Sequence, residues 1–354
     1  MPEELSTRRL LRRLLEVAGI GTAVALVVLV GPGLGSLRNR LAQASPGLVV
    51  AAVGLELLSA VSYVVLFRAV FCPRMKRGLS YQIGMAEQGA NSVLSVSGIG
   101  GLALGAWALH RGGMDTEHIA RRSVAFFFLT SMANVGGVIL FAVLYALGVL
   151  GHDPQPGFTY GFGVAALAAT VLVVALPFVL SDRPPTSSEG RWRRLALARQ
   201  YIRYRLRQGI RDALTLIRRR PVTIIGGSLG IMVFDLAVLA VAYEALHHSV
   251  PLGVVVMGYL IGMLGGNIPI PGGIGGIDLG LTGLLVLYHQ PLAVTAGAVL
   301  IYHAISLWVP AVLGSVAFVQ LRRMLQRTEH PAAVCAPLAE PIEVEGVPAL
   351  AGQQ

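Results

Sequence analysis

The segment Asn267-Ile-Pro-Ile-Pro-Gly-Gly-Ile-Gly-Gly-Ile-Asp278 breaks a long apolar stretch of the chain and decides how that stretch can fold. Pro269 and Pro271 each remove a backbone donor and clash with the preceding turn, so the segment cannot be continuous helix. The glycines that follow permit close approach and unusual backbone dihedral angles. The pattern predicts two half-helices that meet here, the second beginning near Ile277.

The composition assigns the chain to the integral membrane proteins. Of its 354 residues, 55% are hydrophobic and only 13% are charged, and the mean hydropathy is +0.69. A soluble domain carries about a quarter charged residues. The net charge of +10 lies in short basic segments between apolar runs, which follows the positive-inside rule and argues against nucleic-acid binding.

Several apolar runs have the ~20 residues that a helix needs to cross a bilayer. They lie near 17–35, 47–70, 122–149, 158–180, 222–246 and 292–320. Two further apolar stretches, 79–109 and 252–288, are interrupted by glycine, proline and polar residues. We therefore expect an all-α integral membrane fold with six full spans and two helical hairpins.

The distribution of lysine and arginine predicts on which side of the membrane each loop lies. Basic residues gather before the first run, at both ends of 79–109, in 183–220 with its twelve arginines, and after the last run. The loops at both ends of 252–288 have none. We expect both termini in the cytoplasm and two opposed re-entrant hairpins, the first entering from the cytoplasm and the second from outside. An ordinary span beside a poorly formed one is the alternative for each stretch.

A short internal repeat supports this arrangement. Residues 97–105 and 272–280 are identical at six of nine positions, and both segments fall inside the predicted hairpins. The spans that precede the hairpins carry Glu56 and Asp235 near their middles, and the charge pattern gives these spans opposite directions. The chain therefore resembles an inverted repeat, in which broken helices form a substrate site near the bilayer midplane. Chance matching between glycine-rich segments is the alternative.

These assignments divide the chain into six parts. They are the N-terminal basic segment and first span (1–46), the first inverted repeat with hairpin 79–109 (47–150), a connecting span (151–182), a basic amphipathic cytoplasmic helix (183–221), the second inverted repeat with hairpin 252–288 (222–321) and a disordered cytoplasmic tail (322–354).

Polar residues within the apolar segments are candidate site residues. A charge at the bilayer centre costs ~3 kcal/mol or more, so such residues usually face a cavity and have a function. The candidates for substrate binding are Asn91, Asn267, Pro271, Gly272, Gly273, Asp278 and His303. The candidates for lining a translocation path or relaying protons are Glu56, Asp235 and Glu87. Free amide groups at the start of the second half-helix would suit a phosphate.

The same residues also have structural interpretations. Glu56 and Asp235 could form an interhelical hydrogen bond with the acid protonated, and helical spacing puts Tyr63 on the face of Glu56. Asp278 could simply cap its helix. His303 could be a packed side chain, and it is a candidate mainly because Asp278 is available as its partner. We expect no metal site and no cofactor, because no residues have metal-ligand spacing.

The stretch 190–219 combines apolar residues at helical intervals with many arginines. This pattern is typical of a basic amphipathic helix that lies on the cytoplasmic leaflet and is attracted to anionic lipid. Its predicted lipid-facing residues are Arg194, Arg199, Arg203 and Arg207. A topology anchor without lipid selectivity is the alternative.

Four parts of the chain together resemble the membrane domain of the lysylphosphatidylglycerol synthase/flippase family. They are Asn91 to Gly105, Pro269 to Asp278, Tyr302-His303 and Pro310-Ala-Val-Leu-Gly314. The resemblance covers nearly all of the membrane region and implies a flippase-like fold with two inverted re-entrant hairpins. In fused members of that family this domain translocates an aminoacylated phospholipid. Stand-alone relatives are linked to other polar lipids, including polyprenyl-linked sugars and, in one subgroup, hopanoids.

The chain departs from the family pattern at several positions. Asp278 stands where the family usually has Glu, which keeps the charge, and His303 stands where it usually has Arg, which makes the charge pH-dependent near neutrality. Leu102 and Ala103 follow Gly101 where the first-half motif commonly has an acidic residue. Only about thirty residues follow the last span, so the soluble aminoacyl-transfer domain is not expected and synthase activity is not implied.

The sequence therefore predicts a lipid flippase or translocase in a bacterial-type plasma (inner) membrane. It would move a polar-headed lipid (phospholipid, aminoacyl-phospholipid, glycolipid or hopanoid) between leaflets and would not be an enzyme. The alternatives are an ion-coupled small-solute secondary transporter, an intramembrane enzyme acting on a lipid and an accessory membrane protein in lipid biosynthesis. Expected partners are membrane lipids, with lipid-biosynthesis enzymes and a homo-oligomer left open, and no nucleic acid.

Overall fold

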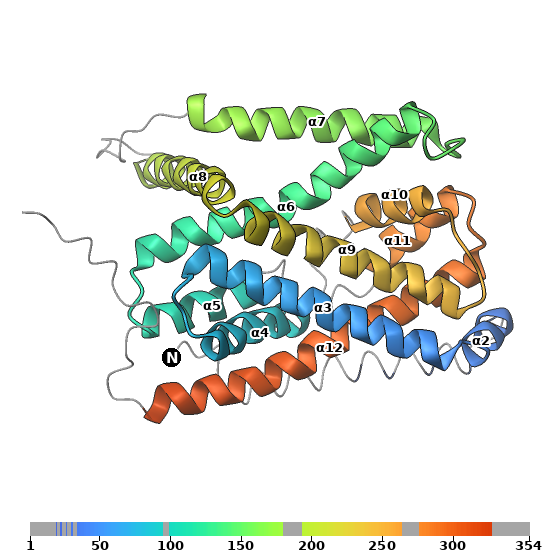
Figure 1. Ribbon diagram of the computed structural model, residues 1–354, viewed down its shortest axis with the longest axis horizontal. Helices are drawn as coiled ribbons and strands as arrows, with labels where there is room; N and C mark the ends of the chain where they lie inside the picture. The colour runs from blue at the N-terminus through green and yellow to red at the C-terminus, as the bar shows by residue number, and fades with distance from the viewer. Residues whose placement is uncertain are drawn as a thin grey trace, which may run out of the picture.

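The computed structural model describes residues 19, 22, 26, 30, 34–94, 99–179, 193–263 and 276–327. All elements in this part of the chain are helices, which confirms the predicted all-α class (Figure 1). In chain order they are α2 (Gly35–Ala42), α3 (Pro46–Phe71), α4 (Arg77–Leu94), α5 (Ile99–Arg111), α6 (Thr116–Ala146), α7 (Pro156–Val179), α8 (Arg193–Arg219), α9 (Pro221–Ala245), α10 (Leu252–Gly262), α11 (Gly276–Leu287) and α12 (Leu292–Arg327).

Among the described helices, α3, α6, α7, α9 and α12 are long and apolar enough to cross a membrane. Large apolar side chains on their outer surfaces are exposed, such as Val61 on α3 and Val164 on α7. Water disfavours a surface of this kind, whereas lipid tails accommodate it. The chain is therefore a multi-pass membrane protein. The other predicted span, 17–35, lies almost entirely outside the described residues.

Helices α3 and α9 pack against each other in the middle of the bundle and run antiparallel (Figure 1). Each begins with a proline, which is tolerated there because the first turn of a helix needs no amide donor. The amide of Ser45, just before α3, donates to the carbonyl of Ala245 at the end of α9 over 2.8 Å. Farther along, the hydroxyl of Ser59 reaches the carbonyl of Ile231 over 3.5 Å. Along these contacts the residue numbers rise in α3 and fall in α9, as expected for antiparallel helices. The contacts bring the middles of the two helices together.

Two pairs of shorter helices, α4 with α5 and α10 with α11, lie toward opposite ends of the α3–α9 pair (Figure 1). Helix α4 also packs on α12, where a Cβ added at Gly89 would lie 2.7 Å from the Cα of Gly314. Helices α10 and α11 also approach closely, because a Cβ added at Gly262 of α10 would lie 2.9 Å from the Cα of Leu281 of α11. Small residues at such contacts let helix backbones approach closely, which is the main source of helix association in lipid.

The two interrupted stretches of the sequence fold into these helix pairs. Residues 79–109 fall on α4 and α5, and residues 252–288 fall on α10 and α11. The second half-helix was expected to begin near Ile277, and α11 begins at Gly276. The repeated glycine motif therefore lies where α5 and α11 begin.

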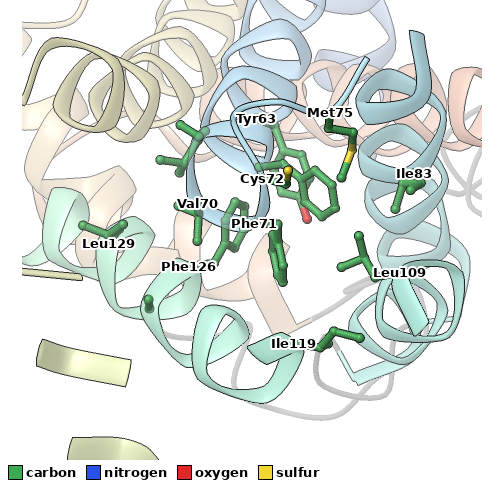
Figure 2. Close-up of a cluster of buried hydrophobic side chains, with 14 of the residues drawn as sticks. Tyr63, Val70, Phe71, Cys72, Met75, Ile83, Leu109, Ile119, Phe126 and Leu129 are labelled. Carbon is green, nitrogen blue, oxygen red and sulfur yellow. The ribbon is translucent and has the colours of Figure 1, made fainter. Parts of the chain in front are cut away.

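A large cluster of buried apolar side chains joins α3 to α4, α5 and α6 (Figure 2). Tyr63 and Phe71 of α3 face Phe126 of α6, and Ile83 of α4 and Leu109 of α5 complete the cluster. The rings of Tyr63 and Phe126 meet edge to face with their centroids 5.1 Å apart, an arrangement that aromatic pairs favour. This packing holds the first short helix pair against the end of α3.

The segment boundaries predicted from sequence need one correction. The predicted amphipathic helix within 183–221 is present as α8, which packs on α6, α7 and α9. The prediction that the chain is disordered from residue 322 onward is wrong for residues 322–327, because α12 continues through Arg327. Arginine, methionine, leucine and glutamine are good helix formers, and Met324 packs on the apolar core. Residues from 328 onward lie outside the described part of the chain.

Candidate functional site

Four polar side chains from four helices meet beside the α3–α9 contact. They are Glu56 of α3, Asp235 of α9, Tyr259 of α10 and Tyr302 of α12, here called the carboxyl–tyrosine cluster. The hydroxyls of Tyr259 and Tyr302 both donate to Oδ2 of Asp235, that of Tyr302 over 3.1 Å. The two tyrosine rings stand edge to face with centroids 6.0 Å apart. Glu56 is only 2% exposed, and its carboxyl group is an electrostatic neighbour of that of Asp235.

A hydrogen bond between these two carboxyl groups would require a proton, because an ionised carboxylate can only accept and two such charges repel each other. Oε2 of Glu56 is buried and has no hydrogen-bond partner in the described ranges. A buried polar atom without a partner is costly, so this oxygen is the atom of the cluster best suited to accept a donor from a substrate. A carboxyl pair that exchanges one proton is also the chemistry of a proton relay.

Glu87 of α4 belongs to a separate contact with Tyr63 of α3. The Tyr63 hydroxyl donates to Oε1 of Glu87 over 3.0 Å, and Glu87 is only 3% exposed. The other carboxylate oxygen lies against Gly105 of α5, where any Cβ would overlap it. Tyr63 was expected on the face of Glu56, but its hydroxyl reaches α4 because that helix packs beside it. Glu87 therefore links α3, α4 and α5.

Asn91 of α4 supports the start of α5. Its Oδ1 accepts a hydrogen bond from the amide of Gly101 over 3.0 Å. The amides in the first turn of a helix have no partner within the helix, so this side chain caps α5 from a neighbouring helix. The substrate-binding role expected for Asn91 stays a prediction beside this structural one.

Asp278 and His303 form a close pair between α11 and α12. Nδ1 of His303 lies 2.8 Å from Oδ1 of Asp278, and the two side chains are 13% and 22% exposed. Asp278 stands in the first turn of α11, where the helix dipole favours a negative charge. The sequence suggested Asp278 as the partner of His303, and the geometry shows the contact; a binding role for the pair stays a prediction. Consecutive residues of α12, Tyr302 and His303, thus contact the carboxyl–tyrosine cluster and the Asp278–His303 pair.

Several predicted substrate-binding residues lie outside the described residues. They are Asn267, Pro271, Gly272 and Gly273. All belong to the segment 264–275 that connects α10 to α11, so their role stays a prediction.

The predicted lipid-facing arginines of α8 do not share one environment. Arg203 is exposed, but Arg207 is only 7% exposed, which does not fit the surface role expected for it. Gly209 of α8 lies so close to Val124 of α6 that a Cβ would overlap it, and this close packing buries the neighbouring part of the helix. The side chains outside the described part are those of Arg194 and Arg199.

Ion pairs also attach α8 to α6. Arg205 contacts Glu117 over 2.6 Å, and Asp212 contacts Arg121 over 3.2 Å and Arg122 over 3.8 Å. Single exposed ion pairs contribute little, but a group of them can fix two helices together. Helix α8 is therefore docked on the protein as well as being strongly basic.

Residues 16–314 match the family model described as the lysylphosphatidylglycerol synthase TM region. The chain belongs to this family. It is also 25% identical over 337 residues to the UPF0104 membrane protein of Methanothermobacter thermautotrophicus, an alignment that covers 86% of this chain and 94% of that protein. No solved structure matches the chain.

The family assignment confirms the resemblance seen in the motifs. The range matched by the lysylphosphatidylglycerol synthase TM region contains the whole carboxyl–tyrosine cluster and the Asp278–His303 pair. These contacts therefore lie in the membrane domain that defines the family.

Neither Tyr259 nor Tyr302 was among the site residues predicted from the sequence. Tyr259 is the one residue with a polar side chain in α10, Leu252–Gly262. A tyrosine hydroxyl buried among apolar residues needs a hydrogen-bond partner, and that signal could have identified it as a site residue.

Proposed function

We propose that this member of the lysylphosphatidylglycerol synthase TM region family moves a polar-headed lipid between the leaflets of the membrane. The observation that carries the proposal is the carboxyl–tyrosine cluster, in which the buried Glu56 and the half-buried Asp235 lie near the middles of two helices long and apolar enough to cross a membrane. Ionisable groups at such depth are costly and usually mark a substrate or ion pathway. A polar path of this kind lets a headgroup cross while the tails remain in the bilayer.

The lengths of three of the four helices in the short pairs support the two re-entrant hairpins of this proposal. Helices α5, α10 and α11 have 13, 11 and 12 residues. At 1.5 Å per residue they are roughly 16–20 Å long, well short of the ~30 Å hydrocarbon core. The two pairs lie toward opposite ends of α3 and α9 (Figure 1), so each would enter from its own face. Both chain termini would lie in the cytoplasm. The two halves would then form an inverted repeat around the cluster.

The residues of the proposed path would have different roles in transport. The Asp278–His303 pair and the segment that holds Asn267 would contact the headgroup, because a helix start offers free amides to a phosphate. Glu56 would accept a donor from the headgroup or exchange a proton with Asp235. Aminoacylated phospholipids, glycolipids and hopanoids are the substrate classes that the proposal includes, and no catalytic step is part of it.

The test is a leaflet-resolved assay in proteoliposomes that contain a fluorescent phospholipid. A membrane-impermeant quencher then reports how much of the lipid has moved from the inner to the outer leaflet. We expect the purified chain to raise the rate of exchange, and Glu56→Ala and Asp278→Ala to abolish the increase. The control is Phe127→Ala, at an exposed position of α6, which should exchange lipid as the unaltered chain does. Exchange no faster than in protein-free vesicles, across lipids of each class, would reject the proposal.

One observation favours a second candidate, a proton-coupled transporter of small solutes. Two neighbouring carboxyl groups in membrane-spanning helices could exchange a proton and so couple transport to an ion gradient, whatever the cargo. In the same vesicles, a proton gradient would drive solute accumulation without lipid exchange if this candidate holds. An intramembrane enzyme would instead change the mass of the added lipid.

A further inference from the structure

A lateral groove of about 540 Å³ opens on the outer surface of the bundle between α3, α4, α9 and α12. Its apolar wall is built from one face of α3, including Leu57, Val61, Val64 and Val65, together with Leu313 of α12. Leu57, Val61 and Val65 are exposed, whereas Glu56 on the same helix is buried and faces α9. The groove therefore lies outside the carboxyl–tyrosine cluster and faces the lipid.

One end of the groove is basic. Arg68 near the end of α3, Arg77 at the start of α4 and Arg220 just before α9 all line it. Nε of Arg68 donates to the carbonyl of Met75 over 2.7 Å, which fixes its guanidinium group at this end. Within the described part of the chain, none of the three arginines forms an ion pair with an acidic side chain. Their charge is available to a ligand.

The dimensions of the groove match one leaflet of a bilayer. From Leu57 to Arg68 the wall of α3 extends over three helical turns, roughly 16 Å at 1.5 Å per residue. Half of the ~30 Å hydrocarbon core is about 15 Å. An acyl chain can therefore lie along the apolar wall while a headgroup stays at the membrane surface beside the arginines.

We propose that this groove is a binding site for an anionic phospholipid of the adjoining leaflet, whose phosphate contacts Arg68, Arg77 and Arg220. Arginine suits a phosphate because its planar guanidinium can donate two parallel hydrogen bonds to it. A zwitterionic headgroup brings its own cation into a site that is already positive, so it binds less well. The inference concerns resident binding and does not depend on lipid translocation, so either proposal can fail without the other.

The test measures lipid binding to the full chain in detergent by native mass spectrometry. The probes are phosphatidylglycerol and phosphatidylcholine with identical acyl chains. We expect one phosphatidylglycerol to bind more tightly than any phosphatidylcholine. The double variant Arg77→Gln/Arg220→Gln should lower the affinity for that phosphatidylglycerol by about tenfold or more. Each basic residue near an anionic lipid contributes roughly a factor of five to the binding constant. Binding of phosphatidylcholine should not change.

Two further variants make the result specific to the groove. Arg111→Gln/Arg323→Gln removes the same charge from exposed positions that do not line it and should bind phosphatidylglycerol normally. Val61→Trp fills the groove from an exposed position, so the fold should tolerate it, and the tight phosphatidylglycerol should be lost. Equal affinity for the two lipids in the unaltered chain, normal binding by Arg77→Gln/Arg220→Gln or by Val61→Trp, or an equal loss in Arg111→Gln/Arg323→Gln would each overturn the proposal.

Discussion

The carboxyl groups of Glu56 and Asp235 are neighbours where two antiparallel helices, each long and apolar enough to cross a membrane, pack against each other. The hydroxyls of Tyr259 and Tyr302 both donate to Asp235. Oε2 of Glu56 is buried and has no hydrogen-bond partner in the described part of the chain. This arrangement distinguishes the two acids, since Asp235 is held by neighbours and Glu56 has an oxygen to offer.

Replacing Glu56 by Gln should separate function from folding. The amide keeps the shape of the side chain and can still donate to Asp235, so thermal stability should change by less than ~1 kcal/mol. The exchangeable proton is lost, however, and lipid exchange in proteoliposomes should fall on the order of tenfold or more. Exchange at the full rate by a stable Glu56→Gln protein would show that the carboxyl group is not used.

The tyrosines of the cluster should contribute to stability through their hydroxyl groups. Tyr302→Phe removes one of two donors to the same oxygen and should cost about 1 kcal/mol. Tyr259→Phe/Tyr302→Phe removes both and should cost roughly 1–3 kcal/mol, because a half-buried acceptor loses both of its tyrosine donors. Unfolding in detergent measures both losses, with Tyr160→Phe at an exposed site as the control. A double variant that is as stable as the control would show that the hydroxyl groups of Tyr259 and Tyr302 do not stabilise the fold.

Gly105 should be intolerant of even one methyl group. A Cβ at this position would overlap the Glu87 carboxylate, so Gly105→Ala should displace α5 and destabilise the protein by roughly 1–3 kcal/mol. The matched control is Gly136→Ala in α6, where nothing lies within 4 Å, and this change should be neutral or stabilising by up to ~1 kcal/mol. Thermal unfolding compares the two variants. Equal stability would mean that α4 and α5 do not pack as closely as described.

Two arginines of α8 should respond differently to truncation. Arg207 is buried against the protein, so Arg207→Ala should destabilise the fold by roughly 1–3 kcal/mol. Arg203 is exposed, and Arg203→Ala should change stability by less than ~0.5 kcal/mol. Unfolding in detergent measures both effects. The reverse order of stability would contradict the docking of α8 on α6.

Much of the helix pattern could be predicted from the sequence, because apolar run length and proline position act locally. The break at Pro269 and Pro271 predicted a helix start near Ile277, one residue from the observed start at Gly276. The pairing of Asp278 with His303 could also be anticipated, since a lone polar residue in an apolar helix needs a partner.

Other contacts depend on how helices pack, which the sequence alone does not determine. Tyr63 shares a helical face with Glu56, yet it bonds Glu87 because α4 lies beside that end of α3. Arg207 belongs to a basic amphipathic pattern, yet it is buried where Gly209 brings α8 close to α6. Tyr259 joins the cluster only because α10 packs next to α9.

The central structural claim is that two short helix pairs enter the membrane from opposite faces and meet around a polar centre. It can be tested by labelling single cysteines with an impermeant thiol reagent from one side of the membrane at a time, after Cys72 and Cys335 have been replaced by alanine. The flanking positions are Lys76 and Arg111 for the first pair and Ser249 and Leu292 for the second, and the inner ends are Ser92 and Ile277.

In this labelling experiment, the re-entrant arrangement predicts that Lys76→Cys and Arg111→Cys react only from the cytoplasmic side. It predicts that Ser249→Cys and Leu292→Cys react only from the other side. It also predicts that cysteines at the inner ends do not react from the face opposite their flanks. Labelling of an inner-end cysteine from that opposite face, or of two flanks of one pair from different faces, would contradict it.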